Sequence, residues 1–353
     1  MDKTNKRVYR KSNRSRKILY QPSINQKLIT LHTVKKAKLN IINTEECDKN
    51  NLIKIYQKLS TLELNINNQC YPHTDQVAIQ FLLRNLSANK HIKVSQLITP
   101  KQYDKNCWFN VMFVTFFISD KGRIFFHFLR QLMIEGKQQD GKPLPLNLWN
   151  VFSLLNYFIE LCKQGNPIAL TINTNKIILN LHKIINPTHN ITNVGEHGNP
   201  LSYYTNIITY LQNTDISVLR VPLRDDTWDM NQITFETAKP PHIIICEIWP
   251  PVIDSIHLTQ FTISGYTYEL DSACIRDTYH RHFSSCLHIE GVEYMYDGAS
   301  QKRLFKRNWK SKLNSKRTWS FPGSISSYNK HNKQLNRWSF SECYHMLFYY
   351  RIN

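Results

Sequence analysis

The sequence predicts an α+β fold, with a helical N-terminal half packed on an antiparallel sheet from the C-terminal half. Residues up to about 213 place apolar side chains at helical spacing, whereas residues from about 214 form short alternating or β-branched runs between turn residues. The 353 residues are enough to bury one large core or two smaller ones. We therefore expect two structural halves with different local patterns.

The first half is expected to be mostly helical. Asp75 precedes an apolar helical pattern and is a favourable N-cap, and a short strand is expected over residues 92–97. Pro100 ends that segment, and Gly122 separates the two helices that follow it. The expected helices cover residues 52–64, 75–86, 107–118, 124–134, 146–162, 175–185 and 201–211.

The second half is expected to form strands. Pro240-Pro241 precedes a short β-branched run, and Glu290-Gly291 is a plausible tight turn between two later strands. The resulting meander would be closed by a final aromatic strand. The expected strands cover residues 216–221, 242–246, 256–263, 266–275, 283–289, 292–296 and 344–350.

The net charge of +19 is concentrated in two segments. Residues 1–38 and residues 301–337 each carry +11, which leaves the rest of the chain at −3. Such segments bind nucleic acid or other polyanions by counterion release, or are simply solvated tails. Residues 1–45 contain few apolar anchors and are expected to form a disordered or partner-bound arm. The residues expected to contact a polyanion are Lys3, Lys6, Arg7, Arg10, Lys11, Arg14, Arg16 and Lys17.

The eight cysteines show neither a C-x-x-C pair nor regular spacing. This argues against a disulfide scaffold or a zinc ribbon and favours reduced thiols. No secretory signal is visible, and the longest apolar run is too short to span a membrane. We expect an intracellular protein with no cofactor and no resident metal.

Cys107 is the first candidate for a catalytic residue. It stands just before the apolar run 108–118, so it is expected to open a buried helix. A helix N-terminus favours a thiolate over a thiol, which makes this a suitable position for a nucleophile. The alternative is that Cys107 is one more buried apolar residue.

His282 and Asp297 form a second candidate pair. If residues 283–289 and 292–296 pair as a hairpin through Glu290-Gly291, these two residues become neighbours at its open end. A carboxylate beside an imidazole orients it and stabilises its charged form. Ordinary sheet histidines are one alternative. Another is a metal site made with His280, His288 and Cys286, which share strand parity with His282.

Four motifs, in order, resemble those of the ubiquitin-specific proteases, a family of papain-like cysteine peptidases. Asn106-Cys107-Trp108-Phe109-Asn110 resembles the family's cysteine box, and Pro240-Pro241 with its strand resembles the segment before the histidine box. Residues 268–297 resemble the Tyr-x-Leu, His-aromatic and aromatic-Asp pattern, and residues 343–351 resemble the closing strand. The resemblance covers roughly residues 100–353.

The resemblance implies a peptidase-like domain over residues 46–353, with a helical part (46–213), a sheet part (214–353) and a basic insert (301–337). It implies that Cys107 is the nucleophile, His282 the base and Asp297 its orienter. Gln102, five residues before the cysteine, would then be an oxyanion donor. The implied substrate is a ubiquitin-like or viral polypeptide.

Some residues depart from the family pattern. Asp104-Lys105-Asn106 replaces Gly-Asn-Thr, Arg281 replaces a glycine, and the zinc-binding fingers are absent. Such reduced versions resemble proteins of large nucleo-cytoplasmic DNA viruses. Two hypotheses remain open at this stage. One is a cysteine peptidase resembling deubiquitinases; the other is a virion or capsid-associated structural protein that binds nucleic acid or acidic virion partners through its basic segments.

Overall fold

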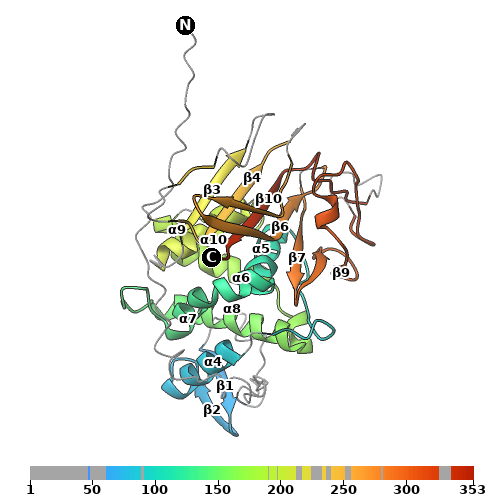
Figure 1. Cartoon of the computed structure of the whole chain (residues 1–353). Coiled ribbons are helices and arrows are strands. Elements are labelled where there is room, and N and C mark those ends of the chain that lie inside the picture. Colours follow the sequence, from blue (N-terminus) through green and yellow to red (C-terminus); the bar gives the residue numbers. More distant parts are fainter. Residues whose placement is uncertain are drawn as a thin grey trace.

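The chain was analysed as a computed structural model, in which helices lie against one large sheet (Figure 1). The structure describes residues 47, 61–88, 91–189, 191–196, 198–211, 217–223, 233–235, 240–250, 256–279, 281–325 and 335–353. The predicted arm over residues 1–45, with all its candidate polyanion contacts, lies outside these residues. Within the described part, no helix is both long and apolar enough to cross a membrane.

The helical half confirms most of the expected helices. Asp75 caps the first of them, since its Oδ1 accepts from the N–H of Val77 at 2.7 Å. The segment expected as one helix over residues 124–134 is two, joined at Phe126. The helices are α4 (Gln76–Ala88), α5 (Cys107–Phe117), α6 (Asp120–Phe125), α7 (His127–Glu135), α8 (Leu146–Gln164), the 3-10 helix η1 (Pro167–Leu170), α9 (Thr174–His189) and α10 (Pro200–Tyr210).

Two local predictions are corrected where the structure describes them, and residues 52–60 of the first lie outside the described part. The end of the helix expected over residues 52–64 is instead strand β1 (Glu63–Ile66), which pairs with β2 (Gln69–Pro72). Leu62, Leu64 and Ile66 are buried at alternate positions, a spacing that sequence alone did not separate from a helical one.

The segment expected as a strand over residues 92–97 also forms no strand. It is a turn, held partly by a hydrogen bond from the Ile92 N–H to Glu290 Oε1 at 2.9 Å. A distant side chain therefore satisfies backbone that would otherwise need a strand partner.

The main sheet has the order β3-β4-β10-β6-β7-β8-β9, with β5 paired to the edge of β6. Every pairing is antiparallel except that of β3 with β4. Each expected strand overlaps an observed one, and the α+β class is confirmed. The strands are β3 (Val218–Leu223), β4 (Ile243–Ile248), β5 (Gln260–Ile263), β6 (Tyr266–Arg276), β7 (Phe283–Ile289), β8 (Val292–Tyr296), β9 (Leu304–Lys306) and β10 (His345–Arg351).

Helix α5 lies at the centre of the molecule, between the sheet and the other helices (Figure 1). All eleven of its residues are buried. Its polar members are bonded across the interface: Ser285 of β7 donates to the Val111 carbonyl at 3.1 Å and contacts Thr115 at 3.3 Å. The first residue of this helix is therefore held on a rigid, fully packed element.

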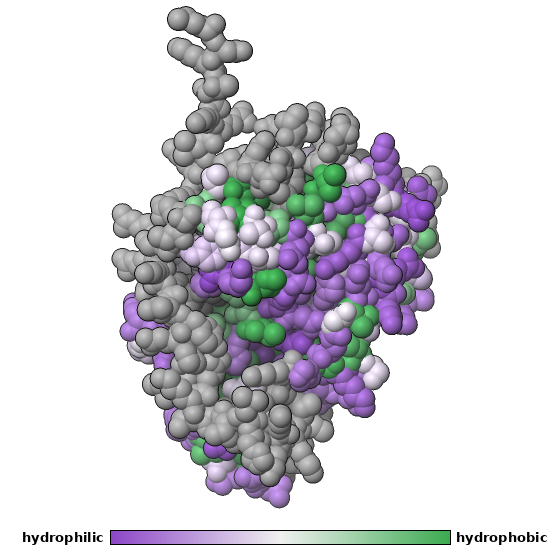
Figure 2. Space-filling model, in the orientation of Figure 1, coloured by the Kyte–Doolittle hydropathy of each residue, from purple (hydrophilic) through white to green (hydrophobic). Residues whose placement is uncertain are grey.

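The described part of the basic insert (residues 301–325 and 335–337), with Trp338 directly after it, is packed rather than a solvated tail. Trp309, Trp319, Phe321 and Trp338 are buried against the face of the sheet opposite to the helices. Most of its described lysines and arginines are exposed, whereas Arg303, Lys310 and Lys312 are half-buried. Hydrophilic residues predominate on the surface around β7 and β9 (Figure 2). The sheet is thus covered on both faces, by helices on one side and by the insert on the other.

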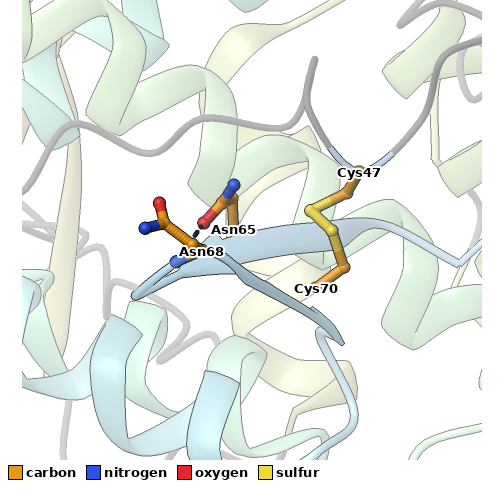
Figure 3. The surroundings of a disulfide bond; sticks show 4 residues. All are labelled: Cys47, Asn65, Asn68 and Cys70. Atoms are coloured by element: carbon orange, nitrogen blue, oxygen red, sulfur yellow. Dashed lines mark hydrogen bonds between the residues drawn. A yellow bond between two sulfur atoms is a disulfide. The ribbon is translucent and has the colours of Figure 1, made fainter.

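The expectation that all cysteines are reduced is wrong for one pair. Cys47 and Cys70 form a disulfide beside the β1–β2 turn, with Cα atoms 5.4 Å apart (Figure 3). They are separated by 23 positions, so no local spacing motif announced the pairing. The other cysteines, including Cys107, are free and buried.

Candidate active site

Cys107 is the first residue of α5 and lies at the edge of a pocket. The residue is 7% exposed and forms part of the pocket wall. The first N–H groups of a helix have no partner within the helix, and the macrodipole there favours negative charge. The sulfur therefore occupies a position that stabilises an anion.

A buried polar network anchors the loop before Cys107 to α5 and α9. Asn106 donates to the Thr174 hydroxyl at 2.8 Å, and that hydroxyl donates to Asn110 Oδ1 at 2.8 Å. Asn110 in turn donates to the carbonyl of Lys101 at 3.2 Å, and Asn106 Oδ1 accepts from the N–H of Tyr103 at 3.0 Å. These bonds fix the loop that carries Gln102.

Gln102 lines the same pocket as Cys107. Its Nε2 donates to the carbonyl of Asp104 at 3.0 Å, and its backbone N–H donates to the carbonyl of Gly298 at 2.9 Å. Its Oε1 is buried without a hydrogen-bond partner. Since an amide nitrogen carries two hydrogens, one N–H of Gln102 remains for a ligand in the pocket.

His282 and Asp297 lie side by side just beyond the ends of β7 and β8. The Nε2 of His282 is 2.6 Å from Oδ1 of Asp297. The hairpin that brings them together turns at Glu290 and Gly291, whose φ angles of 51° and 71° are those of a tight primed turn. A carboxylate only accepts, so Nε2 carries the proton and Nδ1 is the nitrogen left for another partner.

The backbone of His282 is also held. Asp277 accepts from the N–H groups of Arg281 and His282 at 2.8 and 3.1 Å. The N–H of Asp277 donates to the carbonyl of His282 at 2.8 Å. The ring therefore stands on a closed turn between β6 and β7.

The electrostatics of the pair favour a charged imidazole. Burial alone would lower the pKa of His282, but Asp297 and the nearby Cys107 side chain raise it well above its ordinary value. Burial alone would raise the pKa of Asp297, but His282, Ser324 and the Ala299 N–H lower it. The imidazole thus contacts the carboxylate on one side and is within reach of the thiol on the other.

The insert supplies residues to the site that sequence reasoning missed. The Trp338 ring lies 5.8 Å from that of His282, and Ser324 is close enough to Asp297 to lower its pKa. Asn336 donates to the Ser324 hydroxyl at 3.0 Å. Oδ2 of Asp297 nevertheless makes no hydrogen bond of standard length, so the interaction between Ser324 and the carboxylate is weaker than a full hydrogen bond.

One sequence signal could have found this part of the site. Trp309, Trp319 and Trp338 recur through a segment that otherwise looks like a solvated basic tail. Tryptophan is largely buried in folded proteins, so its repetition indicates packed structure.

The pocket beside Cys107 has a volume of about 550 Å³. Trp108, Asn199 and Pro200 line it from the helical half, and Ile325 and Asn336 line it from the insert; Gln102, Cys107 and His282 are also in its wall. The structure thus brings three of the four candidate residues to one cavity, with Asp297 directly behind His282.

The metal alternative does not assemble around His282. His288 lies near the far end of β7, where its Nδ1 donates to the Asp271 carbonyl at 2.7 Å. His280 lies outside the described residues. In the part of the chain that is described, no three metal-ligating side chains come together.

No family model matches this chain, and no curated protein matches it in sequence. Two solved structures are similar at a TM-score of 0.43 and 8% identity. One is a Ubp8/Sgf11/Sus1/Sgf73 SAGA DUB module bound to monoubiquitin, where 73% of this chain aligns with 70% of that one. The other is a Ubp8-Sgf11-Sgf73-Sus1 SAGA DUB module, with 81% and 76% aligned. Structural similarity at these TM-scores carries no functional argument, so the function is argued from the geometry of the site.

Proposed function

We propose that this protein is a cysteine peptidase resembling deubiquitinases, which cleaves peptide or isopeptide bonds. The observation that carries the proposal is the position of His282, whose Nε2 contacts Asp297 and whose ring also interacts with the side chain of Cys107 at a helix N-terminus. A nucleophile, a base and an orienting carboxylate in this order form the arrangement that activates a thiol.

In the proposed reaction, His282 takes the proton of the Cys107 thiol, and the thiolate attacks the carbonyl carbon of the scissile bond. The tetrahedral oxyanion collapses by breaking the C–N bond, and the leaving amine takes the proton from His282. Water then attacks the thioester with His282 as base. The carboxylic acid leaves and the thiol is restored. Asp297 stabilises the imidazolium in both halves.

Two donors are in place for the oxyanion. The Cys107 N–H belongs to the first turn of α5, and Gln102 has an N–H that its bond to Asp104 does not use. One such donor is worth about 3 kcal/mol of the barrier. We propose that Gln102 is a catalytic residue in this sense.

Two departures from the family pattern bear on the proposal. Asp104 stands where the family has glycine, and its φ of 54° is the left-handed conformation that glycine takes readily and aspartate tolerates. The backbone turn is therefore kept. Arg281 lines the pocket, so the second departure changes the charge of the site rather than its backbone.

The substrate is proposed to be a polypeptide, with ubiquitin-like proteins as the first class to test. The viral version of the protein and the virion-scaffold function are not proposed further. The scaffold function depended on the basic arm, which lies outside the described residues, and on the insert, whose described part packs on the sheet.

The test is covalent labelling of the full chain by a ubiquitin vinyl-sulfone probe, alongside iodoacetamide as a small thiol reagent. Cys107→Ala and His282→Ala are the loss variants. Cys246→Ala is the matched control, because Cys246 is also free and buried but lies in β4 away from the pocket. We expect both reagents to modify Cys107, with labelling lost in the first variant and strongly slowed in the second.

Modification of Cys107 by iodoacetamide but not by the ubiquitin probe would support an activated thiol and reject ubiquitin as the substrate. An alkylation rate at Cys107 no higher than in a denatured control would overturn the peptidase proposal. Loss of labelling in Cys246→Ala would show that the loss seen in Cys107→Ala and His282→Ala comes from misfolding rather than from the site.

A further inference from the structure

A row of side chains crosses the sheet and ends at His282. Trp249 follows β4, Tyr344 precedes β10, Arg276 ends β6 and Phe283 begins β7. These strands are neighbours in the order β4-β10-β6-β7, and all four residues line the pocket that contains Cys107. Arg276 and Phe283 are opposite each other in the β6–β7 register, directly beside His282. The row therefore forms a wall along which a bound chain would approach the thiol.

Arg276 is the charged member of this row. Its guanidinium carbon lies 5.0 Å from the centre of the Tyr344 ring and 5.7 Å from that of Trp249. Its Nε is buried and has no hydrogen-bond partner. The two rings, whose centres are 4.4 Å apart, thus pack against the guanidinium without satisfying its Nε–H.

The carboxylate behind Tyr344 does not neutralise Arg276. Glu247 accepts from the Tyr344 hydroxyl at 2.8 Å and is paired with a different arginine, Arg220, at 2.6 Å. Among the described residues that line the pocket, the cations are Lys105, Arg276 and Arg281, and the acids are Asp104 and Glu196. Glu196 already accepts from the N–H of Asn193 at 2.8 Å. The pocket wall beside His282 therefore offers positive charge.

We infer that Arg276, packed beside the paired rings of Trp249 and Tyr344, forms a subsite for a carboxylate of the substrate. This rests on the proposed function and names its substrate class: polypeptides with an acidic side chain, or a free C-terminal carboxylate, near the bond that is cut. A planar guanidinium whose edge is free binds a carboxylate with two parallel hydrogen bonds. Because the two rings already shield part of the guanidinium from water, Arg276 loses little further hydration when it binds a carboxylate.

Binding is tested in the Cys107→Ala protein, where no reaction occurs. Three Gly/Ala peptides carry the same neutral fluorophore: one with an internal Glu and an amidated C-terminus, one with Gln and a free C-terminus, and one with Gln and an amidated C-terminus. Fluorescence polarisation measures each affinity. Arg276→Gln is the test substitution. Arg351→Gln is the matched control, since Arg351 also lies over a tyrosine ring, 5.5 Å from Tyr266, at the other end of β10.

We expect at least one carboxylate-bearing peptide to bind roughly ten-fold more tightly than the amidated Gln peptide. That difference should vanish in Arg276→Gln and persist in Arg351→Gln, with both variants melting as cooperatively as the parent. Preference for the internal Glu identifies a side-chain carboxylate, and preference for the free C-terminus an α-carboxylate.

Equal binding of the three peptides, or a difference that survives Arg276→Gln, would overturn the inference. Because the measurement uses a protein without the thiol, its result is independent of Cys107 labelling. A live thiol with no carboxylate preference would reject only the subsite, and a carboxylate preference without a reactive thiol would reject only the peptidase.

Discussion

His282 and His345 are two buried histidines with opposite electrostatics. His345, at the start of β10, is fully buried, and its Nδ1 donates to the Cys343 carbonyl at 2.7 Å. Burial, together with the neighbouring His257, lowers its pKa to about 3. His282 is as deeply enclosed, yet its pKa is raised well above the ordinary value because it faces Asp297. One ring is kept neutral, while the other is favoured as a cation.

The difference shows that burial alone does not make a base. Both rings have a hydrogen-bond acceptor at one nitrogen: a neutral carbonyl for His345 and a carboxylate for His282. Only the charged acceptor stabilises the imidazolium enough to offset desolvation. A single neighbouring carboxylate thus distinguishes His282, in the candidate site, from His345, in the core, and this difference can be tested.

The largest expected effect is that of Asp297→Asn. Removing the charge leaves His282 with a neutral neighbour and a lowered pKa, as in His345. Because an asparagine side chain can donate as well as accept, the tautomer of His282 is then no longer fixed. We expect the rate of probe labelling at Cys107 to fall by about a thousandfold or more. NMR titration of the His282 ring should show the accompanying fall in its pKa. Unchanged labelling would mean that Asp297 is not the orienter.

The next effect concerns stability and His282→Gln. Because the folded-state pKa of His282 is raised above 6.5, its stabilisation is fully present below pH 6.5 and is lost as pH rises through the folded value. The variant should be less stable by about 3 kcal/mol near pH 6, since it leaves a buried charge unpaired. Urea unfolding across pH would reveal a gap that narrows above pH 6.5. A gap that widens with pH would contradict the pairing.

His345→Phe should show the opposite trend. The folded-state pKa of His345 is lowered to about 3, so the wild-type protein loses stability as pH falls below 6.5. Removing the ring nitrogen should flatten this acid slope by up to about 1.4 kcal/mol per pH unit. The same urea series measures it, and labelling of Cys107 at pH 7 is the control that should not change. An unaltered slope would show that His345 is not buried as a neutral ring.

The smallest effect is expected for Ser324→Ala. The Ser324 hydroxyl lies near Asp297 without a standard hydrogen bond, so its loss should slow labelling by no more than roughly five-fold, the equivalent of about 1 kcal/mol for one full hydrogen bond. A positioning role predicts a shift in the pH profile of labelling. Ser311→Ala, which removes an exposed hydroxyl of the same insert, is the matched control. A uniform loss with an unshifted profile would indicate a structural role only.

Local patterns were sufficient for much of this molecule. The run of apolar residues after Cys107 predicted α5, because it follows the loop after Pro100 and its side chains had to be buried. The Glu290-Gly291 turn predicted the β7–β8 hairpin, and with it the approach of His282 to Asp297. In each case the determining residues are close together in the chain.

Other features depended on distant neighbours. The hydrogen bond from Ile92 to Glu290 replaced an expected strand with a turn, and the Cys47–Cys70 disulfide followed no spacing rule. The charge of the 301–337 segment favoured a solvated or polyanion-binding tail. Its tryptophans instead cover the sheet, and Trp338, directly after the segment, lies beside His282. The charge misled that prediction because exposed lysines occur in packed segments as well as in solvated tails, so their number does not distinguish the two.

By itself, the sequence determined the fold class, the thiol at a helix start and the imidazole-carboxylate pair, because each follows from short-range periodicity or a single turn. Tertiary structure alone decided that the thiol and the imidazole share one pocket, and that Arg276 packs against two rings from the ends of other strands. The physical reason is strand order. β10, the last strand of the chain, lies between β4 and β6, and no local pattern records that placement.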